Sequence, residues 1–161
     1  MKAFQIENIK DFMAALFMKP VFDNFLLVSF EIGKDMTVSI DGTRNRNWYD
    51  SEMERPPYMK WGEVRETASF LVKGKRSPLF IKAVLRLSKE NTKKLIGDAG
   101  GEPEASGDTG LYFNLKFDES GLTIITGSSV NDFKLAGELN RVWDKDLGVF
   151  LKHYGIAFTE M

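Results

Sequence analysis

Apolar and polar residues alternate most regularly in residues 110–129, where two runs flank a turn at residues 118–121. A period of two is typical of a half-buried β-strand. Folding the second run back across the turn brings residues of both runs together on one mainly apolar face. The predicted pairs are Phe117 with Leu122, Leu115 with Ile124, and Phe113 with Thr126. The pattern therefore predicts a β-hairpin.

A second hairpin is predicted in residues 26–40, where alternating runs flank a turn at residues 33–35. Pairing across three loop residues is a common hairpin geometry and again places apolar residues opposite one another. The predicted pairs are Ile32 with Met36, Phe30 with Val38, and Val28 with Ile40.

The remaining elements follow from helical spacing and from one further alternating run. Apolar residues at helical intervals predict helices at 8–18, 59–73 and 88–96, with Ser88 as the cap of the third. A last helix begins after Asn131 or Asp132 and stops at Gly155. Residues 79–87 predict a central strand, and residues 156–158 a short edge strand.

These elements predict an α+β fold in a single domain spanning residues 1–161. Hairpin connections dominate, so the sheet should be mainly antiparallel. We expect about five strands, from the two hairpins and one further strand, packed by three to four helices. Residues 43–58, which contain a Pro-Pro pair, should be irregular. The aromatic cluster of Trp48, Tyr49, Tyr58 and Trp61 could line a pocket or a partner-binding patch, but we expect Trp48 and Trp61 to be anchored in the core. Residues 98–109 should form a flexible acidic loop.

Composition narrows the classes of protein that the chain can belong to. The 161 residues are 43% hydrophobic, enough for one core. No cysteine is present, which excludes disulfides and thiolate chemistry and favours a cytoplasmic location. Charged residues interrupt the first twenty positions and no apolar run is long enough to span a bilayer, so we expect neither a signal peptide nor a membrane partner.

The near-neutral net charge of −1 conceals a separation of charge along the chain. Residues 43–86 carry five more basic than acidic residues, and residues 98–121 carry five more acidic than basic ones. Cations interleaved with aromatic rings are typical of surfaces that bind phosphates or unstacked bases. Solvated surface charge and the preference of helix ends for cations explain the same residues without a ligand. The candidate ligand-binding residues are Arg44, Arg46, Tyr49, Tyr58, Lys73, Lys75 and Arg76.

Motifs for catalysis, cofactors or metals are not found in the sequence. Gly74-Lys75 lacks the glycine spacing and the following Ser or Thr of a nucleotide-binding loop. The run GSSVN at residues 127–131 lacks the second glycine of a nucleophile elbow, and His153 is the only histidine. Asp144 and Asp146 are two apart on a helix, so they should point to different sides. We therefore predict no catalytic residues, no metal site and no cofactor.

Several segments together resemble an uncharacterised bacterial protein family of clostridial Firmicutes. They are FDNFLLVSFEIGKDMTVSIDG (22–42), the Trp61-x-x-Val64 pair, LVKGKRSPLFIKAVLRLS (71–88), LYFNLKFDESGLTIITGSS (111–129) and VWDKDLGVFL (142–151). The resemblance spans nearly the whole chain. It implies a stand-alone bacterial domain of unknown function, and it supplies no site residues.

The sequence thus favours a non-enzymatic binding module with an anion-binding face for nucleic acid or a phosphate-bearing ligand. One alternative is a protein–protein interaction module or homodimer, in which the basic segment of one copy meets the acidic segment of another. The other is an enzyme that uses carboxylates and a substrate-bound metal.

Overall fold

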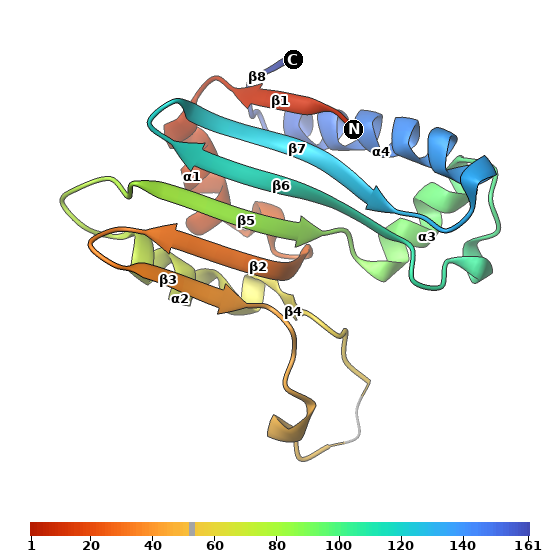
Figure 1. The fold of residues 1–161 in the computed structure, drawn as a ribbon, viewed down its shortest axis with the longest axis horizontal. Coiled ribbons are helices and arrows are strands. Elements are labelled where there is room, and N and C mark those ends of the chain that lie inside the picture. The colour runs from red at the N-terminus through yellow and green to blue at the C-terminus, as the bar shows by residue number, and fades with distance from the viewer. Residues whose placement is uncertain (52–53) are drawn as a thin grey trace.

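A single β-sheet organises the protein, whose structure is a computed structural model that describes residues 1–51 and 54–161. Across those residues eight strands pair, all antiparallel, in the order β3-β2-β5-β6-β7-β1-β8, with β4 beside the start of β2 (Figure 1). The strands are β1 (Ala3–Ile6), β2 (Leu26–Gly33), β3 (Thr37–Asp41), β4 (Met59–Lys60), β5 (Phe80–Arg86), β6 (Gly110–Asp118), β7 (Gly121–Ser129) and β8 (Phe158–Glu160). The α+β class and the antiparallel sheet are confirmed, whereas the expected number of about five strands is wrong.

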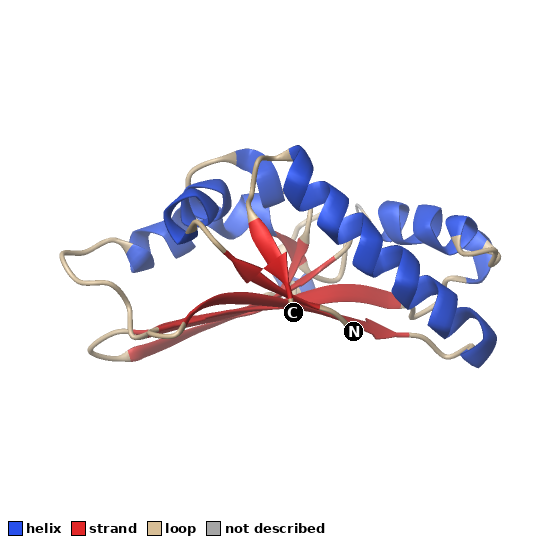
Figure 2. Ribbon diagram, turned by 90° about the horizontal axis from the view of Figure 1, so that it is seen from above, coloured by secondary structure: helices blue, strands red, loops and turns tan. Residues whose placement is uncertain are grey.

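Within the same described residues, four α-helices all cover one face of the sheet, and the other face is open (Figure 2). They are α1 (Ile9–Phe17), α2 (Trp61–Val72), α3 (Lys89–Asp98) and α4 (Phe133–His153). The connections that the structure describes contain three single-turn helices: η1 (Pro20–Phe22), η2 (Arg46–Trp48) and η3 (Pro103–Ala105). The side chains of Asn8, Ser88 and Asp132 accept backbone N–H groups at the starts of α1, α3 and α4.

The core fills the space between the helices and the covered face of the sheet. Trp61, at the start of α2, is fully buried and packs against Phe17 and Phe30, and its indole N–H donates to the carbonyl of Leu16. Trp48 is 80% exposed, so the expectation of core packing is wrong for this residue. The reason is geometric, because η2 lies on a loop that leads away from the sheet (Figure 1).

The two predicted hairpins have different outcomes. The β6–β7 register is confirmed, with Phe117 opposite Leu122. In the β2–β3 hairpin the loop is residues 34–36, so Ile32 pairs with Val38 and the predicted pairing of Ile32 with Met36 is wrong. Met36 is 67% exposed in the turn, where Lys34 N–H donates to its carbonyl. The shift of two residues leaves the apolar face unchanged, because side chains in a strand alternate with a period of two.

Both ends of the chain contribute strands that the local pattern underestimates. Phe4 in β1 pairs with Ile124 of β7 on one side and with Glu160 of β8 on the other. The edge strand expected at 156–158 is instead β8, because Gly155 with a φ of 71° ends α4 and the next residues lead to the sheet. The termini therefore lie side by side, and Met161 N–H donates to the carbonyl of Ala3.

The irregular segments are partly ordered. In the 43–58 loop, a bridge joins Thr43 to Tyr58 and η2 forms one turn, while residues 52 and 53 lie outside the described part. The 98–109 segment starts at the last residue of α3 and contains η3, and its flexibility stays a prediction. No helix in the described part of the chain combines the length and apolarity needed to cross a membrane.

Candidate functional site

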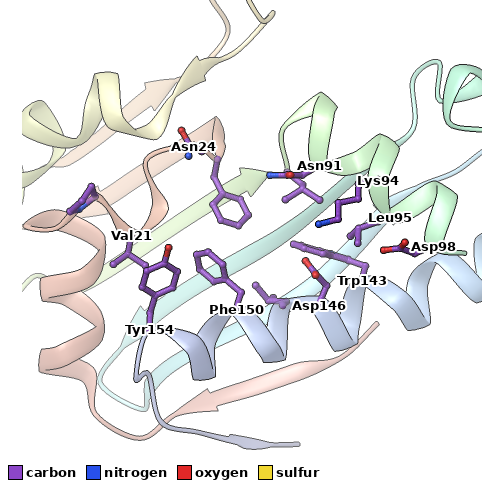
Figure 3. Close-up of a pocket in the computed structure, with 14 residues that line it drawn as sticks. Val21, Asn24, Asn91, Lys94, Leu95, Asp98, Trp143, Asp146, Phe150 and Tyr154 are labelled. Atoms are coloured by element: carbon purple, nitrogen blue, oxygen red, sulfur yellow. The ribbon is translucent and has the colours of Figure 1, made fainter.

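A pocket opens between α3, α4 and residues 20–25, which comprise η1 and the segment after it (Figure 3). Its volume is about 320 Å³, at the lower end of the range for small-molecule sites. Its walls come from residues 20–25, from Leu87 after β5 together with α3, and from α4 with Tyr154 at its end. The side chains that matter most are Asn24, Phe25, Asn91, Lys94, Asp98, Trp143, Asp146, Phe150 and Tyr154.

Helix α4 presents one continuous face to the pocket. The residues of this face follow one another at intervals of three or four: Trp143, then Asp146 and Leu147, then Phe150, then Tyr154. Trp143 and Leu147 are fully buried, whereas Tyr154 at the end of the helix is 47% exposed. A carboxylate thus stands within an otherwise apolar stripe.

The facing helix α3 repeats the same spacing. Asn91, Lys94, Leu95 and Asp98 fall on one side of it, because intervals of three and four residues bring side chains to one face. Leu95 is buried against the core, while the three polar residues are exposed at the mouth of the pocket. The pocket therefore has an apolar floor and a polar rim.

Aromatic contacts fix the shape of the floor. Phe25 stands edge-on to Phe150 at 5.4 Å between ring centroids, and Phe150 lies 4.9 Å from Tyr154. The indole N–H of Trp143 donates to the carbonyl of Tyr112 at 3.0 Å, which fixes the orientation of the ring. These contacts hold the apolar wall in place without a ligand.

Asp146 is the half-buried carboxylate of the pocket, and Figure 3 shows it beside Trp143 and facing α3. Burial raises the pKa of Asp146; the nearby ammonium of Lys94 acts against this rise, and the carboxylate of Asp98 adds to it. Asp144 points the other way, toward the sheet, and accepts a hydrogen bond from Thr126. The expectation that the two aspartates face different sides is confirmed.

Several polar side chains at the pocket make no hydrogen bond or ion pair with the described part of the chain. Among residues 1–51 and 54–161, no hydrogen bond or ion pair involves the side chains of Asn24, Asn91, Lys94, Asp98, Asp146 or Tyr154. The site offers amide donors and acceptors, two carboxylates, one ammonium and one phenol around an apolar floor. Such a constellation suits an organic ligand with an apolar body and a polar group.

The residues predicted from the basic segment lie elsewhere, and Arg44 is enclosed within its own loop. Its guanidinium donates two hydrogen bonds to Glu63, at 3.0 and 3.2 Å, and one to the hydroxyl of Tyr49 at 2.7 Å. It also donates to the carbonyls of Pro56 and Tyr58. All five N–H groups are thereby used, so in this conformation Arg44 has no donor left for a ligand.

The same ion pair shifts the pKa of both partners. Hydrogen bonding to Arg44 holds the pKa of Glu63 below its usual value, and Glu63 raises the pKa of Arg44. Of the other predicted residues in this loop, Arg46 is exposed, and Tyr49 lies beneath the guanidinium of Arg55 at 4.0 Å. The Cζ atom of the Arg86 guanidinium lies 5.9 Å from the ring centroid of Tyr58.

Lys73, Lys75 and Arg76 are exposed between α2 and β5, at the far end of β2 from the 43–58 loop. The end of β2 near this turn is Gly33, which pairs with Phe80, whereas the 43–58 loop joins the other end. The structure therefore does not bring the two groups of predicted residues together on one face (Figure 1).

Sequence reasoning missed the pocket because its residues come from distant segments. The signal that could have indicated it is Asp146, a carboxylate three residues after Trp143 and four before Phe150 in an apolar stripe. No group of three or more His, Asp or Glu residues in the described part of the chain is arranged to hold a metal ion.

The fold and the pocket define the class of protein: a one-sheet α+β domain with a small ligand-sized cavity between two helices. The chain belongs to the family of unknown function DUF5721, whose family model matches residues 15–159. This confirms that the resemblance is to a family without an assigned activity, while its bacterial distribution stays a prediction. Neither a search of curated proteins nor a search of solved structures found a match.

Proposed function

We propose that the protein is a binding domain that holds a small organic molecule in the pocket between α3 and α4. The observation that carries this proposal is Asp146, a half-buried carboxylate that lines the pocket and makes no hydrogen bond or ion pair among the described residues. Burial raises its pKa, and carboxylates with such a shift that line a cavity are candidates for ligand-binding residues.

The shape and lining of the pocket support the same function. Small-molecule sites combine an apolar, aromatic lining with a few polar groups that fix the orientation of the ligand. Here Trp143, Phe25 and Phe150 form the apolar part, and Asn91 and Asp146 are among the polar groups. No residue arrangement in the described chain selects a reaction, so binding is the function proposed.

The test is nuclear magnetic resonance with a ¹⁵N-labelled protein and 2-phenylethanol as a neutral aromatic probe at millimolar concentration. We expect saturable shifts of backbone amides concentrated in α3 and α4. Shifts that are absent, or that centre on another surface, would overturn the proposal.

A variant that blocks the mouth of the pocket provides the matched control. Asn91→Trp adds bulk at an exposed position of the rim, and it should abolish the saturable shifts without unfolding the protein. Glu90→Trp makes the same addition one residue earlier, outside the pocket lining, and should leave binding unchanged.

A second candidate function is the binding of a nucleic acid or another phosphate-bearing ligand at the turn after α2. The observation that favours it is a cluster of Lys34, Lys73, Lys75 and Arg76, in which the Lys34 ammonium donates to the carbonyl of Lys73. Within the described residues, no acidic side chain pairs with these four cations. This candidate uses only part of the anion-binding face expected from the sequence.

Titration with a fluorescent single-stranded oligonucleotide at two salt concentrations tests this second candidate. Binding should weaken steeply with salt and be lost in Lys75→Glu/Arg76→Glu, but not in Lys134→Glu/Lys145→Glu on α4. Equal loss in both double variants would show a general charge effect and would count against a site at the turn.

A further inference from the structure

The α3–α4 pocket is lined by unequal numbers of acidic and basic side chains, and this difference indicates the charge of the ligand that would fit. Asp98 and Asp146 contribute two carboxylates, and Lys94 contributes one ammonium. Lys94 makes no ion pair with either carboxylate within the described structure. An excess of one negative charge therefore remains at the polar end of the pocket.

The positions of the groups indicate where a ligand cation would sit. Figure 3 shows Asp146 on α4 opposite the α3 residues Lys94 and Asp98, with Phe150 and Tyr154 farther along α4. The acidic end and the aromatic end are thus adjacent parts of one cavity. The repulsion of Asp98, which contributes to the raised pKa of Asp146, would be relieved by a cation placed between the helices.

Aromatic rings strengthen the same preference. A cation over the face of a Trp, Tyr or Phe ring is attracted by the π electrons, and the attraction grows when water is excluded. Trp143 beside Asp146 is almost completely buried, so the rings that stay accessible near the carboxylate are those of Phe150 and Tyr154, one and two turns farther along α4. The amide oxygen of Asn91 can accept a further N–H group at the rim.

We infer that the ligand is a cationic amine with an apolar or aromatic body, its ammonium held by Asp146 and Asp98 and its body placed against Phe25 and Phe150. The inference rests on the proposed function, since it assigns a chemical class to the same pocket. An anionic ligand would meet two carboxylates and is disfavoured. A neutral ligand would leave the excess negative charge uncompensated.

Three probes with one phenylethyl body and different charge test the inference: 2-phenylethylamine, 2-phenylethanol and 3-phenylpropionate. Their dissociation constants are measured at pH 7 from the amide shifts of α3 and α4. We expect the amine to bind about fivefold more tightly than the alcohol, because a charged hydrogen bond is stronger than a neutral one. The carboxylate should bind most weakly.

Two variants locate the effect. Asp146→Asn should lower the ratio of the alcohol's dissociation constant to the amine's from about five toward one. Glu90→Gln removes one negative charge from α3 outside the pocket lining and should preserve the preference for the amine. A preference that falls equally in both variants would reflect the general field of the protein and would overturn the inference.

The outcomes separate the two proposals. Binding of the alcohol with no preference for the amine would overturn the cationic class and leave the pocket as a binding site. Tighter binding of 3-phenylpropionate would also overturn it and would indicate Lys94 as the main contact. Failure of all three probes would overturn the proposed function and the inference together.

Discussion

Arg44 stabilises a long loop that has little regular structure of its own. Its guanidinium joins Glu63 on α2 to three groups of the 43–58 loop: the hydroxyl of Tyr49 and the carbonyls of Pro56 and Tyr58. The residue is only 8% exposed. A planar group with five fixed donors can satisfy such a set of acceptors, whereas an ammonium cannot. Arg44 therefore links the loop to α2, in addition to the backbone bridge between Thr43 and Tyr58.

Replacement of this side chain is expected to destabilise the protein. Arg44→Lys keeps the charge but loses several hydrogen bonds, so the free energy of unfolding in urea should fall by about 2 kcal/mol. Arg46→Lys, at an exposed position two residues later, is the control and should change it by less than about 0.5 kcal/mol. Equal effects of the two substitutions would contradict the role given to Arg44.

The charge of Asp146 should reduce stability at neutral pH. Its folded pKa is raised by burial, so the folded state binds a proton more readily than the unfolded state does. The penalty is absent below the unfolded pKa, which is about 3.9 for an aspartate, and fully present above the folded pKa. Asp146→Asn should therefore be more stable than the parent at pH 7, and the gain should disappear as pH falls toward 4.

Urea unfolding at pH 7, 5 and 4 measures this difference. Asp35→Asn, at an exposed turn position, is the control and should change the free energy of unfolding by less than about 0.5 kcal/mol at each pH. A stability gain for Asp146→Asn that is the same at every pH would show that the carboxylate charge is not its cause.

At the scale of elements, the β2–β3 hairpin shows how a turn determines a register. Gly33 pairs with Thr37, and Met36 occupies the last position of the loop. Met36→Ser should therefore lower the free energy of unfolding by less than about 0.5 kcal/mol. Val38→Ser removes a half-buried side chain that is paired with Ile32 and should lower it by about 1 kcal/mol. Urea denaturation measures both values. A larger loss of stability for the Met36 variant would support the register predicted from the sequence instead.

Local pattern predicts elements well where one face of a helix or strand decides the outcome. The β6–β7 hairpin, the caps Ser88 and Asp132, and the apolar stripe of α4 all follow from residues close together in sequence. The β2–β3 register does not, since Met36 is apolar and continues the alternation although it lies in a turn. Apolarity alone cannot distinguish an exposed turn residue from a strand residue.

Long-range pairing explains the other differences. Phe4 and Ile6 alternate over only four residues, too few to identify β1, and the strand exists because β7 and β8 flank it. The pocket has the same origin, because Phe25, Lys94 and Asp146 meet only after α3 and α4 pack on one sheet. Contacts between such distant segments cannot be predicted from the spacing of residues along the chain.

For the whole molecule, the adjacent termini predict tolerance of a new chain order. Lys2 forms an ion pair with Glu160 at 2.8 Å, so a linker of about four glycines can join the ends. Asp50 and Ser51 are both exposed, so a circular permutant opened between them should keep a free energy of unfolding within about 2 kcal/mol of the parent's.

The contrasting permutant is opened between Asn114 and Leu115, inside β6. That strand pairs with both β5 and β7, so its interruption should prevent cooperative unfolding in urea or heat. Equal stability of the two permutants would mean that the continuity of β6 contributes little to the fold.

The position of β1 also has a consequence for synthesis on the ribosome. This strand is translated before all others, but its neighbours β7 and β8 are among the last to be made. At about 10 residues per second, β1 waits on the order of 10 s for its first partner strand. During that interval β1 lacks the two strands with which its backbone pairs in the folded protein, so this sheet is completed only after β8 has been translated.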